Sequence, residues 1–185
     1  QAADIVQLAH LSQLTFLDWV WPQQQAVLPP TLQQLRCNSP GTNQGIIADL
    51  GISRVAHLQS LELTVPCSHG QTVQQLQSLS ALRALTSVTL SYDDLLIADA
   101  MAPAWRHLPL QQLTLGGGGL ALAVVGDEVT LEAVASAKML TRLDLNVEDV
   151  GAVSVCRHLT GLTALKDLRW VLEVSDDIVY RDALY

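Results

Sequence analysis

The sequence has few aromatic and few charged residues. Aromatic side chains make up 4% of the chain and charged ones 15%, whereas 49% of the residues are hydrophobic. Because aromatic residues are scarce, aliphatic side chains must fill any core. A disordered chain would need the opposite balance of charge and hydrophobicity. The 185 residues can therefore hold one ordinary domain or one continuous repeat array with a sizeable core.

A surplus of basic residues is also missing. Ten Lys and Arg residues stand against eighteen Asp and Glu residues, for a formal net charge of −8. Nucleic acids and anionic membrane surfaces both require clustered positive charge. The longest apolar runs, such as residues 120–125, are much shorter than the roughly 18 residues of a membrane-spanning helix. We therefore expect neither a nucleic acid nor a membrane as the partner.

Cysteine is rare, and its number is odd. Three cysteines cannot form a fully paired disulfide framework. Cys37 and Cys156 lie in apolar periodic stretches and are expected to be small core residues. These features favour a reducing compartment, so we expect a cytoplasmic location. The chain lacks the pattern of a secretory signal. It does not begin with Met, so we expect it to be an excised fragment or a processed segment of a longer protein.

Leucine, in contrast, is abundant: 34 residues are Leu, and they recur in one phrase. The phrase is L-x-x-L-x-L, with apolar residues or Cys as substitutes. It occurs seven times, as LTFLDW, LQQLRC, LQSLEL, LTSVTL, LQQLTL, LTRLDL and LKDLRW. Its second and third apolar positions are Leu17/Trp19, Leu35/Cys37, Leu61/Leu63, Val88/Leu90, Leu113/Leu115, Leu143/Leu145 and Leu168/Trp170.

The spacing of the phrase predicts stacked units. Successive occurrences are 18, 26, 27, 25, 30 and 25 residues apart. The L-x-L part has period two, which predicts a short strand with both apolar residues on one face. Such a unit cannot bury its apolar face alone, but stacked units bury a continuous core. Because every crossover has the same sense, the strands should pair in parallel.

The segments between the strands favour helices. Residues 72–85, 129–140 and 150–165 carry apolar residues at helical spacing. Asp127 and Thr130 are candidate N-caps for a helix over residues 133–140. Gly51 is expected to split the helical pattern of residues 46–58. Trp105 lies in a crossover and Trp21 at a strand end, and either could be partly exposed.

The seven phrases resemble those of the leucine-rich-repeat family, and the resemblance covers essentially the whole chain. It implies an α/β fold: a right-handed solenoid, curved like a horseshoe, with parallel strands on the concave side and helices on the convex side. Residues 1–185 would form a single array of about seven repeats, truncated at one or both ends. The chain departs from the family pattern because the Asn or Cys usual after the strand is replaced by Pro, Asp, Gly or Glu.

The resemblance also implies a binding face. In this family the residues between and beside the strand leucines point to the concave side, and partners tend to bind there. The middle of this face is uncharged and rich in hydroxyl groups, and the charges lie toward both ends. The candidate partner-binding residues are Asp18, Arg36, Glu62, Ser87, Thr89, Ser91, Gln112, Thr114, Arg142, Asp144, Asp167 and Arg169. A solvated sheet face without a partner is the alternative interpretation.

The remaining charges are unevenly distributed along the units. Acidic pairs such as Asp93-Asp94 follow the strands, whereas basic residues come late in the crossovers, as at Arg54, Arg83, Arg106, Lys138 and Arg157. This pattern predicts an acidic edge and a more basic opposite edge. Helix dipoles favour this arrangement, and stabilisation alone could account for it. Electrostatic steering of a partner is the alternative.

No catalytic, cofactor-binding or metal-binding constellation is apparent in the sequence. Four of the five histidines directly precede a leucine at a helix end or connector. This position recurs in the repeat unit, which favours a structural role. None has a second ligand at the spacing of a zinc site. The glycines at 116–119 are not followed by Lys and Ser or Thr, so they are not a phosphate loop. We therefore expect no enzyme activity, no cofactor and no metal.

The function expected from these features is a protein-protein interaction scaffold within a larger protein, with a protein or peptide as its ligand. The resemblance leaves three alternatives open. The chain could be the substrate-receptor or regulatory segment of a ubiquitin ligase, part of an immune-type sensor, or a purely structural scaffold attached to an enzyme domain.

Overall fold

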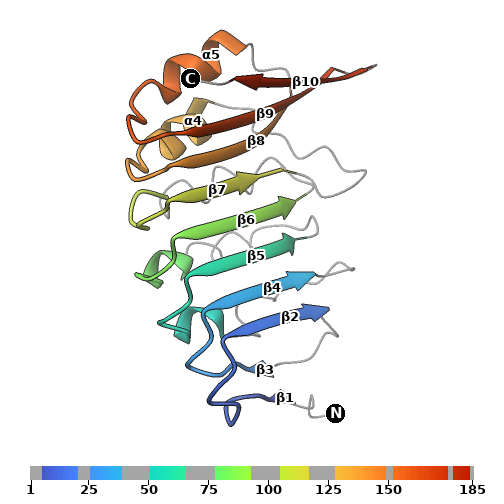
Figure 1. Ribbon diagram of the computed structural model, residues 1–185, viewed down its shortest axis with the longest axis vertical. Helices are drawn as coiled ribbons and strands as arrows, with labels where there is room; N and C mark the ends of the chain where they lie inside the picture. Colours follow the sequence, from blue (N-terminus) through green and yellow to red (C-terminus); the bar gives the residue numbers. More distant parts are fainter. Residues whose placement is uncertain are drawn as a thin grey trace.

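A largely parallel β-sheet and a few helices make up the α/β fold of this chain (Figure 1). The computed structural model describes residues 6–20, 26–38, 51–65, 78–92, 105–116, 128–148, 152–174 and 177–183. The main sheet contains β2 (Phe16–Val20), β4 (Gln34–Asn38), β5 (Ser60–Val65), β6 (Ser87–Tyr92), β7 (Gln112–Leu115), β8 (Arg142–Glu148), β9 (Asp167–Val174) and β10 (Asp177–Ala183). The described helices are α4 (Glu128–Ala135), α5 (Ala152–Leu159) and the 3₁₀ turns η1 (Ile52–Arg54) and η2 (Ser78–Ala81).

The strands of the main sheet lie side by side in chain order, so that each strand from β4 to β8 is flanked by the strands before and after it (Figure 1). From β2 to β9 all neighbours are parallel, and β10 pairs antiparallel with β9. Two short strands, β1 (Val6–Gln7) and β3 (Ala26–Val27), pair separately. The seven sequence phrases coincide with β2 and β4 to β9, which confirms the predicted strands and their parallel pairing.

The register of the sheet also agrees with the prediction. Leu63 pairs with Leu90, Leu90 with Leu115, and Leu115 with Leu145. The two apolar positions of each strand therefore line up across the sheet. These side chains are almost completely buried from β5 to β8, because the period of two turns them all to the same covered face.

A turn with recurring hydrogen bonds leads into each of these strands. The backbone N–H groups of Thr86 and Ser87 both donate to the carbonyl of Gln59, at 2.9 and 3.0 Å. The same pair of bonds joins Thr141 and Arg142 to Gln111, at 2.8 and 3.0 Å. In β4 to β9, the residue before the strand and the strand's first residue both bond to the preceding unit in this way. The units are thus equivalent in backbone geometry as well as in sequence.

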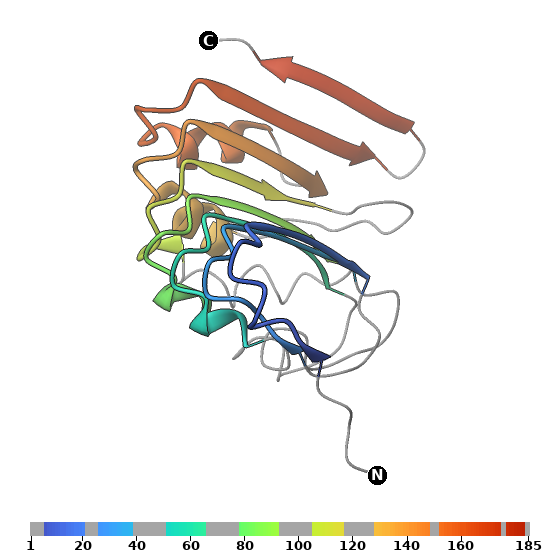
Figure 2. The same cartoon turned by 60° about the horizontal axis from the view of Figure 1, so that its bottom comes forward.

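The described helices lie on one side of the main sheet, and its other face is open (Figure 2). Leu131 and Val134 of α4 are fully buried together with the inward strand residues. Along β4 the exposure alternates strictly, with Leu35 and Cys37 buried and the three residues around them exposed. The core therefore lies between the sheet and the crossovers, and the polar strand residues face outward.

Some expectations for the crossovers are wrong. The helix begins at Glu128, so Thr130 lies inside α4 and cannot be its N-cap. Trp105 is fully buried, because the crossover before β7 packs its indole ring into the core. The sequence analysis also missed β10. Gly51 has φ 58° and directly precedes η1, in a left-handed conformation that favours glycine. None of the described helices is both long and apolar enough to cross a bilayer.

Candidate interaction surface

The open face of the main sheet carries all twelve candidate residues. They occupy the outward positions of β2 and β4 to β9, between the buried apolar positions. We refer to these outward side chains as the sheet strip. Its middle row follows the strand register directly and reads Asp18, Arg36, Glu62, Thr89, Thr114, Asp144 and Arg169. The register therefore places these side chains in continuous rows on the open face of the sheet.

An ion-paired triplet occupies the N-terminal end of the middle row. The Nε atom of Arg36 donates to Oε2 of Glu62 at 2.7 Å, and NH1 of Arg36 lies 3.8 Å from Oδ2 of Asp18. The hydrogen bond to Glu62 is the main cause that raises the pKa of Arg36 above its ordinary value. About half of the Arg36 side chain remains exposed. Arg36 thus already pairs with both of its neighbours in the sheet.

Short hydroxyl side chains occupy the centre of the sheet strip. Thr89 and Thr114 stand in the middle row, with Ser87 and Ser91 on either side along β6. All four are partly exposed. Among the described residues, no side-chain hydrogen bond is formed by these hydroxyls. The centre can therefore offer both donors and acceptors to a ligand.

The C-terminal end of the sheet strip carries a second set of charges without direct pairing. Burial raises the pKa of Asp144 above its ordinary value, and the positive charges of Arg169 and Arg142 oppose that shift. Within the described residues, neither arginine lies close enough to a carboxylate to form an ion pair. The register places Asp182 of β10 opposite Arg169, so the backbone order is acid, arginine, acid at this end too.

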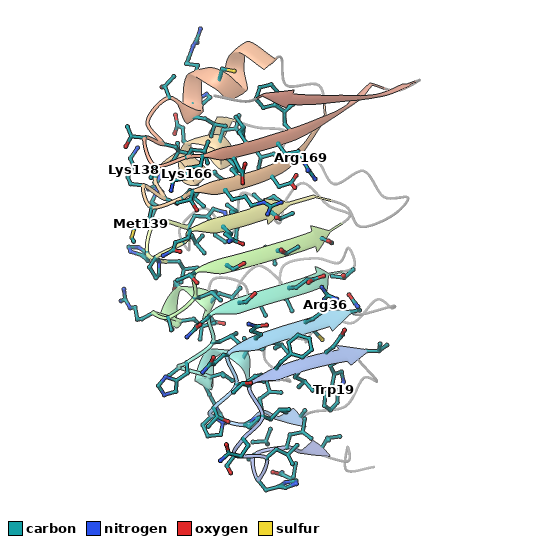
Figure 3. The ribbon with its side chains drawn as sticks, in the orientation of Figure 1. Trp19, Arg36, Lys138, Met139, Lys166 and Arg169 are labelled. Carbon is teal, nitrogen blue, oxygen red and sulfur yellow. The ribbon has the colours of Figure 1, made fainter. Side chains whose placement is uncertain are left out.

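Of the two edges predicted from the sequence, the structure describes the residues of the basic edge. The side chains of Arg54, Arg83, Arg106, Lys138 and Arg157 are all exposed. In Figure 3, Lys138 and Lys166 lie at the edge where the turns enter the strands, away from Arg36 and Arg169 on the sheet. The acidic residues that define the predicted opposite edge, such as Asp93 and Asp94, lie outside the described residues.

The thiol of Cys37 is buried in the core. Burial is the main cause that raises the pKa of the Cys37 thiol to about 12, and the nearby negative charge of Asp18 adds to it. Cys37 therefore stays protonated near neutral pH and is a poor nucleophile. In the part of the chain that is described, no group of three or more His, Cys, Asp or Glu residues could hold a metal ion. Cys67 and His69 lie outside that part.

Sequence reasoning missed several exposed apolar residues. Phe16 and Val20, at the two ends of β2, are 52% and 68% exposed, and Met139 is 55% exposed in the turn before β8. Phe16 and Val20 are not among the candidate partner-binding residues, although both are exposed on β2. Met139 follows the apolar spacing of the crossover, so no local signal marked it as exposed.

The chain matches no protein-family model. Among curated proteins, no sequence is similar to it.

Proposed function

We propose that this chain is a right-handed leucine-rich-repeat solenoid that binds a protein or peptide on the open face of its main sheet. The observation that carries the proposal is the sheet strip, a continuous row of outward side chains in register across β2 and β4 to β9. The parallel strands in chain order and the recurring hydrogen bonds of the turns support the solenoid. In this proposal residues 1–185 are one array, and the role is binding without catalysis.

The chemistry of the strip favours a polypeptide over other ligands. Its centre is a group of hydroxyls that make no side-chain hydrogen bond among the described residues, including those of Thr89 and Thr114. Such groups can pair with the amide and carbonyl groups of a peptide. The charges at the two ends have mixed signs and are best matched by a partner with mixed signs of its own. A net charge of −8 opposes the binding of a polyanion along this face.

The burial of Asp144 also supports binding on the open face. Its pKa is raised by burial, so an ionised Asp144 is held at some cost in stability at neutral pH. Natural proteins keep groups of this kind more often at functional sites than elsewhere. A hydrogen-bond donor of the partner that contacts Asp144, between Arg142 and Arg169, would stabilise the ionised carboxylate. Binding would then offset this cost.

The proposal can be tested by blocking the centre of the strip. The variant Thr89→Arg places a long cation among the short hydroxyls and should leave the fold intact, since Thr89 is partly exposed. The matched control is Gln13→Arg, which adds the same residue at an exposed position outside the strip. Both variants and the wild type are used as baits in cell extract, and captured proteins are quantified by mass spectrometry.

We expect at least one protein to be captured by the wild type and by Gln13→Arg, and to be lost with Thr89→Arg. This protein is then purified and its affinity measured with all three baits. A partner that binds Thr89→Arg as tightly as the wild type would contradict binding at the centre of the sheet strip.

A further inference from the structure

The turns that enter the strands have an unusual composition. We call the six residues before each of β2 and β4 to β9 a strand-entry turn. No Asp or Glu occurs in any of these seven turns, although the chain has eighteen acidic residues. Five consecutive turns, those before β5 to β9, each contain one Lys or Arg. The turns are residues 10–15, 28–33, 54–59, 81–86, 106–111, 136–141 and 161–166.

The cations of these turns come from five successive units, whose turns stack along one edge of the sheet. We name Arg54, Arg83, Arg106, Lys138 and Lys166 the basic belt. Neighbouring strands are about 4.8 Å apart, and the strand-entry turns follow the same stacking. The Nζ atom of Lys138 donates to the carbonyl oxygen of Gly161 in the next turn at 3.3 Å, which links two adjacent units. Lys138 and Lys166 lie close to each other at this edge (Figure 3).

The basic belt is available for binding. All five side chains are exposed, and within the described residues none of them forms an ion pair. The belt therefore concentrates positive charge on a chain whose net charge is −8. Met139, next to Lys138, adds an exposed apolar side chain that can pack against a ligand (Figure 3).

Helix dipoles explain only part of the belt. A dipole favours a cation only near the C-terminus of a helix, and in the belt this applies to Arg54 in the three-residue η1 and to Arg106, which directly follows the helical Trp105. Lys138 lies three residues beyond the end of α4, and Lys166 directly precedes a strand. Arg83 lies beyond the end of η2. Since the five cation positions are exposed, acidic residues would fit there equally well by size.

We propose that the basic belt binds an acidic protein segment that lies across the strands, at a site separate from the sheet strip. Charge complementarity identifies the occupant as an anion. The turns contain no Phe, Tyr or Trp on which a base could stack, and their aromatic side chains are limited to His10, His57 and His107, which disfavours single-stranded nucleic acid. Leu11 and Met139 are the exposed large apolar side chains of these turns and stand far apart in sequence, which disfavours insertion into a membrane.

The test compares two triple variants of the full chain with equal change in charge. The belt variant carries Arg83→Gln, Arg106→Gln and Lys138→Gln. The strip variant carries Thr89→Glu, Ser91→Glu and Thr114→Glu. Each lowers the formal charge by three. Binding of fluorescent poly-L-glutamate is measured by anisotropy at low salt, with oligothymidylate and phosphatidylserine-containing vesicles as competing anions. Circular dichroism establishes that both variants are folded.

We expect the wild type to bind poly-L-glutamate more tightly than oligothymidylate or the vesicles. The belt variant should lose about tenfold in affinity, since each exposed charge pair contributes little and three are removed together. The strip variant should lose less than about twofold. Equal losses of affinity in both variants would show that net charge alone determines the binding of poly-L-glutamate, and would overturn the proposal. So would an absence of poly-L-glutamate binding, or binding of the nucleic acid or the vesicles at least as tightly.

This experiment is independent of the proposed function. A partner of the sheet strip should be lost with Thr89→Arg and retained by the belt variant. Either proposal can therefore be contradicted without affecting the other one.

Discussion

The two ends of the main sheet have the same strand pattern but different surroundings. In β2, the inward residues Leu17 and Trp19 are only half-buried, and the described sheet ends there. In β8, Leu143 and Leu145 are fully buried between strands on both sides. At the C-terminal end, β10 flanks β9 and so gives it a second neighbour. The same apolar phrase therefore stabilises the fold to different degrees, because burial depends on the neighbours of a strand.

The charges of the sheet strip differ between the two ends as well. Arg36 is held by two carboxylates, whereas Asp144 is half-buried without an ion pair among the described residues. The N-terminal end thus satisfies its charges internally, and the C-terminal end carries an unfavourable carboxylate. Register alone therefore does not decide whether an ion pair forms.

The largest difference is expected from a charge placed at the inward position. Leu143→Asp puts a carboxylate into the closed core and should cost more than about 4 kcal/mol, enough to unfold much of the sheet. The equivalent change at the open end, Leu17→Asp, should cost only about 1 kcal/mol, because the side chain can reach water. Thermal unfolding followed by circular dichroism measures both. Similar melting temperatures for the two variants would contradict the difference in burial.

A titratable core residue should make the N-terminal part sensitive to alkali. Cys37 occupies the inward position that holds Leu145 in β8, and burial raises its pKa from 9.0 to about 12. Above pH 9 the unfolded chain releases this proton and the folded chain does not, so the free energy of unfolding should fall. At pH 10 the loss should be about 1.4 kcal/mol.

The control for this prediction is Cys37→Ala, which should be less stable than the wild type at pH 7 but should lack this part of the alkaline loss. Urea unfolding of both proteins at pH 7, 9 and 10 isolates the contribution of the thiol. Parallel pH profiles for the two proteins would contradict a protonated Cys37.

A smaller effect, of opposite sign, is expected at Asp144. Its folded pKa lies above the ordinary value of 3.8, so the cost of ionisation is fully present at neutral pH. Asp144→Asn should therefore raise the free energy of unfolding at pH 7 by about 0.5 kcal/mol, because half of the side chain is in water. Below pH 3.8 both forms are neutral and the gain should disappear. Destabilisation by Asp144→Asn at pH 7 would show that the carboxylate is well paired.

The smallest difference is expected between two arginines of the middle row. Arg36→Gln removes both contacts to Asp18 and Glu62 and should lower the melting temperature slightly at low salt, an effect that high salt abolishes. Arg169→Gln removes no ion pair of the described residues and should change the melting temperature less. Calorimetry at low and high salt measures both, and a larger, salt-sensitive loss for Arg169→Gln would reverse the comparison.

The strands and the face of the candidate site could be predicted from the sequence, but the crossovers only in part. A period of two places Leu61 and Leu63 on one face and Glu62 on the other, whatever the rest of the chain does. Helix ends carry weaker signals, and Thr130 was misassigned because an N-cap residue is also tolerated inside a helix. The strand β10 was missed because it lies outside the seven repeated phrases.

The exposure of single residues was the least predictable feature. The sequence allowed partial exposure of Trp105, which is buried, and Met139 matched the apolar spacing but is exposed. Both belong to segments between strands, where several paths of the backbone satisfy the same pattern. The pairing of Arg36 with Glu62 follows from the register, but the lack of an ion pair at Asp144 among the described residues does not.

The sequence by itself determined which residues alternate between the core and the surface, since strand geometry fixes this locally and the phrase repeats it seven times. It also determined that cations, and no acids, lie in the strand-entry turns. Only the tertiary structure decided which outward charges meet, how deeply each strand is buried, and that the cations lie exposed along one edge. These properties depend on distances between units, and the distances follow from the stacking of the whole sheet and from no single segment.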